Sequence, residues 1–210
     1  MLPPPLIALS PGDLAVGDEL DFLRRLEAAV RGGLRGLLLR EAVLDDGPLL
    51  ALGRAARERL GPDAWLGLHD RAHLARAAGA DALHLGFRSL ALGSLPAALT
   101  EGLALGLSTH APDDPAGWAG ADYLFHGPVN ATPSKQGLLE PVGIAGLRRA
   151  VASATAPVWG IGGLRPEDAA AVIGAGAAGV AALSGVLGAG HPERAARAWV
   201  EALAAAGCAR

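Results

Sequence analysis

Short apolar runs alternate with longer amphipathic stretches from one end of the chain to the other. The apolar runs have the length and composition of buried strands, whereas the stretches between them repeat apolar residues at helical spacing. The predicted strands are Leu6–Ser10, Gly36–Glu41, Trp65–His69, Ala82–Gly86, Ala104–Ser108, Tyr123–His126, Val158–Ile161 and Val180–Ser184. The clearest predicted helices are Glu19–Arg31, Pro48–Leu60, Ala72–Ala78, Ile144–Ala152, Pro166–Ile173 and Glu193–Ala205.

Eight alternations of strand and helix in a chain of 210 residues are typical of a compact (βα)8 barrel. An open doubly wound sheet has the same local patterns and is the alternative. The even spacing of the strands and the glycine-rich ends of the last two favour the barrel. No change of composition marks a linker, so we predict one α/β domain, a single TIM barrel over residues 1–210.

The composition narrows the classes of partner. A formal net charge of -3 gives no reason to expect a nucleic acid or an anionic membrane surface. Cys208 is the only cysteine, so no disulfide forms within the chain and a reducing compartment is indicated. No apolar stretch is long enough to cross a membrane, and no targeting segment stands out. We therefore expect a cytoplasmic protein.

Lys135 is the only lysine among 18 basic residues. Its survival indicates a position that needs a compact ammonium rather than a guanidinium, although coding bias alone also leaves isolated lysines. The loop around Lys135 also contains Thr132 and Ser134, and their hydroxyls suit an anionic ligand. A solvated turn is the alternative interpretation of this loop.

Four of the six histidines fall at predicted strand ends, where TIM barrels gather their catalytic groups. Each is a candidate acid or base near neutral pH, and each could equally be a hydrogen-bonded structural histidine. No ligand spacing indicates a zinc or iron site. The four are His69, His84, His110 and His126.

The last two predicted strands end in Gly162-Gly163 and Ser184-Gly185. Glycines let a ligand approach the backbone, and the loops after strands seven and eight of barrels commonly bind phosphate. The alternative is that these glycines only turn the chain. Arg40, at the end of the second strand, could bind a phosphate or form an ion pair with Glu41. Asp70, after the third strand, could orient a histidine, bind a metal or cap the next helix.

Taken in order, a set of short motifs resembles the thiamine phosphate synthase / TenI superfamily over about Leu37 to Leu187. Single motifs are weak, but the ordered set is specific. They are Leu39-Arg40-Glu41, His69-Asp70-Arg71, Ala80-Asp81-Ala82-Leu83-His84-Leu85-Gly86, Leu107-Ser108-Thr109-His110, Ala121-Asp122-Tyr123, Gly127-Pro128-Val129, Thr132-Pro133-Ser134-Lys135, Ile161-Gly162-Gly163 and Gly179-Val180-Ala181 with Ser184.

The resemblance implies a (βα)8 barrel of thiamine biosynthesis. The synthase branch joins a pyrimidine pyrophosphate to a thiazole phosphate with Mg2+. Carried over by position, the thiazole phosphate would meet Gly162, Gly163 and Ser184. The pyrimidine and pyrophosphate side would be formed by Arg40, Asp70, Ser108, Thr132, Ser134 and Lys135.

This chain departs from the synthase pattern on the second side only. The family's Gln-x-Arg-Glu-Lys reads Leu38-Leu39-Arg40-Glu41-Ala42, and the Asn before Asp70 is His69. The family's Gly-Gln-x-Asp reads Gly86-Phe87-Arg88-Ser89. One cation and one magnesium carboxylate are therefore lost, which leaves Asp70 as the only matching metal ligand and weakens the stabilisation of a departing pyrophosphate.

A barrel that keeps the phosphate site and loses the other resembles the TenI branch, which includes thiazole tautomerases. We therefore expect an isomerase that aromatises a carboxythiazole phosphate by proton transfer, with no metal or cofactor. The branch's histidine aligns with Pro128, but His126 lies two residues earlier and would face the same side of an extended strand. His126 is thus the expected acid/base, with His84 and His110 as fallbacks.

Two alternatives stay open. One is a true synthase, which would use Mg2+ at Asp70; the other is a barrel that binds thiazole or thiamine phosphate without turnover. In each case the expected partner is a small phosphorylated thiazole, and a homodimer is possible.

Overall fold

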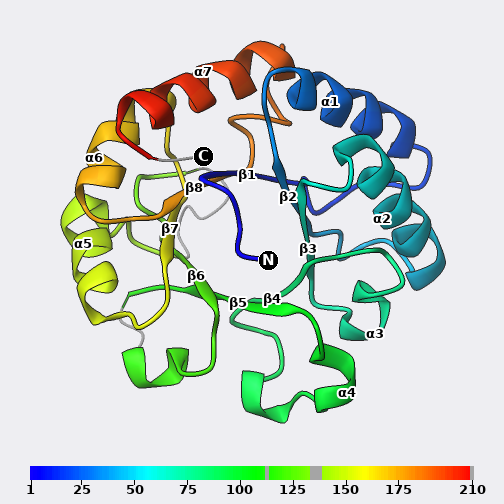
Figure 1. The fold of residues 1–210 in the computed structure, drawn as a ribbon, viewed down its shortest axis with the longest axis horizontal. Helices are drawn as coiled ribbons and strands as arrows, with labels where there is room; N and C mark the ends of the chain where they lie inside the picture. The colour runs from blue at the N-terminus through cyan, green and yellow to red at the C-terminus, as the bar shows by residue number, and fades with distance from the viewer. Residues whose placement is uncertain (112–113, 133–138, 209–210) are drawn as a thin grey trace.

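The computed structural model describes residues 1–111, 114–132 and 139–208. Eight parallel strands form a closed barrel in the order β1-β2-β3-β4-β5-β6-β7-β8, with β8 paired to β1 (Figure 1). The predicted barrel is confirmed, and closure rules out the open-sheet alternative. The strands are β1 (Leu6–Leu9), β2 (Gly36–Leu39), β3 (Trp65–His69), β4 (Ala82–Leu85), β5 (Ala104–Thr109), β6 (Tyr123–His126), β7 (Val158–Ile161) and β8 (Gly179–Ala182).

The helices surround the barrel (Figure 1). They are α1 (Glu19–Arg31), α2 (Asp46–Leu60), α3 (Ala72–Ala75), α4 (Ala97–Thr100), α5 (Gly143–Ser153), α6 (Ala169–Gly174) and α7 (Pro192–Ala205), with 3-10 turns η1 (Leu92–Ser94), η2 (Pro115–Trp118) and η4 (Pro166–Asp168). The third predicted helix is shorter than expected, and the fifth, predicted to begin at Pro166, begins as the turn η4. Between β5 and β6 the described chain forms only η2.

Alternation along the strands separates two apolar cores. One fills the barrel interior and includes Ile7, Leu38, Tyr123 and Phe125. The other lies between the strands and the helices and includes Leu124, the residue between Tyr123 and Phe125. The period of two that defines a strand therefore decides which side chains can reach the barrel mouth.

Small residues make room for aromatic rings inside the barrel. A Cβ atom on Gly106 would lie 2.0 Å from Cζ of Tyr123, and one on Gly67 would lie 2.4 Å from Cη2 of Trp65. Those rings cross the interior of the barrel and contact each other edge to face, with centroids 5.8 Å apart. Large side chains on β3 and β6 thus pack over glycines on β3 and β5 and leave the opposite, C-terminal mouth open.

The N-terminal segment covers the other end of the barrel. The indole N–H of Trp65 donates to the carbonyl of Met1 at 3.2 Å, and that of Trp159 donates to the carbonyl of Pro4 at 2.9 Å. Figure 1 shows this segment running into the centre of the ring. Among the described residues, no helix has the length and hydropathy to cross a membrane.

We predict that Gly106→Ala destabilises the protein because the added methyl group collides with a ring that has no space to move. Overpacking of a core commonly costs about 1–3 kcal/mol, and chemical denaturation measures it. Gly93→Ala, where a Cβ has nothing within 4 Å, is the matched control. Equal unfolding free energies for the two variants would contradict this packing.

Candidate functional site

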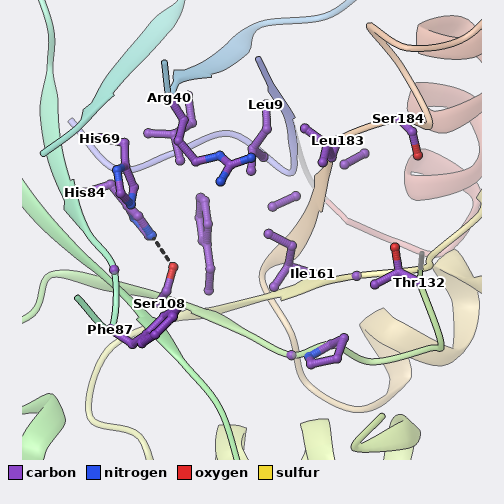
Figure 2. Close-up of a pocket in the computed structure, with 18 of the residues that line it drawn as sticks. Leu9, Arg40, His69, His84, Phe87, Ser108, Thr132, Ile161, Leu183 and Ser184 are labelled. Carbon is purple, nitrogen blue, oxygen red and sulfur yellow. Dashed lines mark hydrogen bonds between the residues drawn. The ribbon is translucent and has the colours of Figure 1, made fainter. Parts of the chain in front are cut away.

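A cavity of about 990 Å3 opens at the C-terminal ends of the strands. Every strand contributes to its lining, from Leu9 on β1 to Ala182 on β8. Figure 2 shows Thr132 and Ser184 on one side of this cavity, His69 and His84 on the other, and Arg40 projecting between them. The two halves expected from the sequence therefore face one space.

The predicted phosphate residues Gly162, Gly163 and Ser184 all line the cavity. Gly163 has φ of 63°, and a Cβ there would lie 2.4 Å from the carbonyl oxygen of Ala131. A side chain would thus push the loops after β6 and β7 apart. The helix after β8 begins only at Pro192, so Ser184 lies in a turn rather than at a helix start.

Asn130 and Asp168 hold the loop after β7 in place. The Asn130 amide donates to Asp168 Oδ2 at 3.2 Å, and the backbone N–H of Arg165 donates to the same oxygen at 2.9 Å. The guanidinium-bearing Arg165 also lines the cavity. A rigid glycine loop next to a cation suits a phosphate group.

Arg40 lies at the opposite end. Its backbone N–H donates to the Ser10 hydroxyl at 2.7 Å, and one terminal nitrogen donates to the carbonyl of Pro11 at 3.0 Å. Its Nε is buried and has no hydrogen-bond partner in the described chain. Arg40 is therefore positioned by its neighbours and retains donor capacity for a ligand.

Glu41 does not pair with Arg40. Its carboxylate is 3% exposed and accepts hydrogen bonds from the backbone N–H groups of Gly12 and Leu14, each at 2.9 Å. The ion-pair alternative for Arg40 is wrong because the carboxylate turns away to hold the loop between β1 and α1.

His69 is the last residue of β3, and Asp70 follows it with a φ of 54°. His69 Nδ1 lies 3.3 Å from Asp70 Oδ2, and both residues line the cavity. Burial lowers the pKa of His69; the Asp70 carboxylate opposes this shift and Arg40 adds to it. Asp70 thus lies beside a histidine, and α3 has no side-chain cap.

His84 links the cavity to the barrel core. Its Nε2 is 2.8 Å from the Ser108 hydroxyl (Figure 2). Its Nδ1 is 3.2 Å from the Tyr123 hydroxyl. Burial, with a smaller contribution from His69, holds the pKa of His84 well below its ordinary value of 6.5. The imidazole is therefore neutral near pH 7.

The direction of the protons along this chain follows from the environment of Tyr123. Burial raises the pKa of its phenol, so the hydroxyl stays protonated, and His84 Nδ1 is its only acceptor in the described chain. With Nδ1 accepting, Nε2 carries the ring proton and donates to Ser108. The Ser108 hydroxyl is then free to donate into the cavity, where it can bind an anionic oxygen.

His126 does not line the cavity. It is 4% exposed on the helix-facing side of β6, with Nδ1 2.9 Å from the Thr109 hydroxyl and its ring 6.0 Å from that of Trp118. Pro128 does line the cavity. The expectation that the two share a side is wrong, because β6 ends at His126 and the alternation does not extend to Pro128.

The other predicted residues are placed as follows. His110 lines the cavity, with its ring 5.9 Å from that of Phe87, and Ser108 and Thr132 line it as well. Ser134 and Lys135 lie outside the described residues. Of the three histidines proposed as acid or base, the cavity therefore includes His84 and His110.

The described lining offers Mg2+ few protein ligands. Mg2+ prefers oxygen ligands in octahedral geometry, usually one or two carboxylates together with substrate phosphates and water. Glu41 and Asp70 are the carboxylates among the described lining residues, and both Glu41 oxygens are bonded to backbone amides. In the described part of the chain no group of three His, Cys, Asp or Glu side chains could hold a metal ion. Asp70 lies 3.3 Å from the imidazole of His69.

Sequence reasoning missed two further cavity features. Arg88 and Arg165 line the cavity, and the Tyr123–His84–Ser108 chain connects its wall to the core. The strand-end positions of Ser108 and His84 and the period of two were available signals for the chain. The sequence gave no signal that Arg88 and Arg165, which lie in loops, would line the cavity.

We predict that the free energy of unfolding falls as the pH drops below about 6.5, the ordinary pKa of histidine. Folding lowers the pKa of His84, so below pH 6.5 the unfolded chain binds a proton that the folded chain does not bind. The free energy of unfolding therefore falls by up to about 1.4 kcal/mol for each pH unit. His84→Asn makes this slope shallower in denaturation curves between pH 7 and 5. His191→Gln, at an exposed position, is the control and leaves the slope unchanged. An unaltered slope in His84→Asn would contradict the neutral buried imidazole.

Comparison with known proteins gives a consistent family. The family model described as "Thiamine monophosphate synthase" (TMP-TENI) matches residues 12–186. A thiamine-phosphate synthase from Moorella thermoacetica is 39% identical over 186 residues, which is 87% of this chain and 88% of that protein. A bifunctional thiamine biosynthesis protein from Symbiobacterium thermophilum is 44% identical over 179 residues, 82% of this chain and 37% of that longer protein.

Among solved structures, a thiamine phosphate pyrophosphorylase from Pyrococcus furiosus superposes with a TM-score of 0.80 at 25% identity. The match covers 96% of each chain. These similarities do not separate the TenI branch from the synthase branch. With the closed barrel and its phosphate-type mouth, they establish that this chain belongs to the thiamine monophosphate synthase (TMP-TENI) family and is an enzyme of thiamine biosynthesis.

Proposed function

We propose that this chain is a thiamine-phosphate synthase, which joins a pyrimidine pyrophosphate to a thiazole phosphate. The observation that carries the proposal is a single cavity that includes both the phosphate loop and the retained residues of the pyrophosphate side, Arg40, Ser108 and Thr132. The names of the relatives support the same reaction. The isomerase expected from the sequence loses its main support because His126 lies outside that cavity.

The chemistry of coupling agrees with the groups available. A ring nitrogen of the thiazole forms a bond to the methylene carbon of the pyrimidine as the bond from that carbon to pyrophosphate breaks. The pyrophosphate leaves with the electron pair, and no proton has to be removed from carbon. The reaction therefore needs positioning and stabilisation of the departing anion rather than a general base.

Each half of the cavity then has a task. The loop with Gly162, Gly163 and Ser184 would bind the thiazole phosphate and hold the ring nitrogen toward the centre. At the other end, the guanidinium group of Arg40 would hold the pyrophosphate, and the Ser108 hydroxyl would donate to the same anion. His84, held neutral, would keep that hydroxyl oriented.

A thiazole phosphate isomerase of the TenI type is the second candidate. It is favoured by the poor fit of the donor set to Mg2+, because moving a proton needs no metal. His110 would then be the acid or base, since it lines the cavity and histidine is the side chain most often used in proton transfer. The partner would again be a phosphorylated thiazole.

We predict that the purified protein forms thiamine phosphate from the two substrates and that Arg40→Gln lowers the turnover about a hundredfold or more. Removing one preorganised donor from a departing anion typically costs about 10²–10³ in rate. His126→Asn keeps the side-chain hydrogen bond to Thr109 and leaves coupling close to the wild-type rate. Product formation is followed by chromatography.

Two other outcomes would displace the proposed synthase, and a third would contradict the placement of His126. Isomerisation of the carboxythiazole phosphate without coupling, abolished in His110→Ala, would establish the isomerase. Coupling that is lost in His126→Asn, with folding intact, would contradict the position assigned to His126. Binding of thiazole phosphate with neither reaction would favour a non-catalytic barrel.

A further inference from the structure

The cavity is rich in arginine where the family resemblance expects a metal. Four arginines line it, Arg40, Arg71, Arg88 and Arg165, against two carboxylates, Glu41 and Asp70. The pKa of His69 is lowered, so this imidazole does not offset the carboxylates at neutral pH. The lining therefore favours a multiply charged anion without help from a cation in solution.

The four arginines differ in their free capacity. Arg71 is ion-paired with Asp46 and also donates to the carbonyl of Leu44. Arg88, by contrast, has no hydrogen bond or ion pair in the described chain and only stacks over Phe87, with Cζ 5.4 Å from the ring centroid. Arg40 keeps a buried Nε without a partner. Arg40 and Arg88 are thus the cations able to bind a ligand beside β2 and β4.

The turn after β4 presents Arg88. Ser89 stands where the family pattern has the second metal carboxylate, and its hydroxyl accepts the backbone N–H of Gly86 at 2.7 Å. This bond closes the turn that contains Phe87 and Arg88. The substitution of Asp by Ser thus removes a metal ligand and keeps the turn, while the neighbouring position supplies a guanidinium group.

Adjacent strands bring these groups to one side of the mouth. Leu39 on β2 pairs with Leu68 on β3, and His69 pairs with His84 on β4. The residues that follow, Arg40, Asp70 and the Gly86–Ser89 turn, therefore extend from three neighbouring strand ends. Arg40 is close enough to His69 to lower its pKa.

We propose that Arg40 and Arg88 form a metal-independent binding site for a diphosphate group, in which the Arg88 guanidinium replaces the positive charge that a divalent cation supplies elsewhere in the family. The inference rests on the proposed function for the identity of the anion, which would be the pyrophosphate of the pyrimidine substrate. Guanidinium forks bind phosphate oxygens in pairs and carry a charge at every working pH. As the bond from carbon to pyrophosphate breaks, the electron pair goes to an oxygen held by these donors.

The test is binding of inorganic pyrophosphate, measured by isothermal titration calorimetry in EDTA and again in excess Mg2+. This measurement needs no turnover, so it tests the binding site even if the protein does not couple the two substrates. We expect wild-type protein to bind pyrophosphate in EDTA with an affinity that Mg2+ does not improve. Arg88→Gln should weaken binding about tenfold, the size of one charge-assisted hydrogen bond.

The controls separate the guanidinium group from charge and from folding. Arg24→Gln removes one exposed positive charge from α1, outside the cavity lining, and should leave the affinity unchanged. Arg88→Lys keeps the charge without the planar fork and should fall between wild type and Arg88→Gln. Ser89→Asp restores the carboxylate and should make pyrophosphate binding respond to Mg2+.

Two results would overturn the proposal: binding of pyrophosphate only in the presence of Mg2+, or equal affinities for wild type and Arg88→Gln in EDTA. Absence of thiamine phosphate formation, with pyrophosphate binding as expected, would instead count against the proposed function and leave this site intact.

Discussion

Closure of the eight parallel strands makes each strand turn its side chains alternately toward the barrel interior and toward the helices. This constraint decides which residues can meet a ligand. His84 points inward on β4 and joins Ser108 to Tyr123, while His126, the last residue of β6, points outward toward Trp118. His84 and His126 were both predicted at strand ends, but only His84 lines the cavity.

The mouth must also match the charge of its ligand. The two histidines on the inner wall, His69 and His84, are neutral near pH 7 because burial lowers their pKa values. Glu41 is occupied by the backbone of the loop after β1. Positive charge therefore comes from arginines at the rim, and this arrangement suits two phosphorylated groups at opposite ends of one cavity. The same arrangement offers a magnesium ion little support, because Asp70 is the one lining carboxylate among the described residues that is not bonded to backbone amides.

The fold was predictable because the barrel depends on patterns that repeat in every unit. The apolar runs gave eight strands close to their observed bounds, and Gly162, Gly163 and Ser184 line the cavity as the strand-end rule implies. The side that His126 faces follows from alternation along β6, and the error came from extending that alternation past the predicted strand end at His126 to Pro128. Contacts made over long separations were equally hidden. Glu41 binding the amides of Gly12 and Leu14 is an example, because it requires the loop geometry that only the folded barrel supplies.

The proposed diphosphate site uses arginines rather than a metal. A crystal grown with pyrophosphate and Mn2+, which replaces Mg2+ and scatters anomalously, tests it most directly. We expect density for pyrophosphate contacted by Arg40 and Arg88, with no anomalous peak between the anion and Asp70. An anomalous peak coordinated by Asp70 and the pyrophosphate oxygens, with Arg88 turned to solvent, would contradict it.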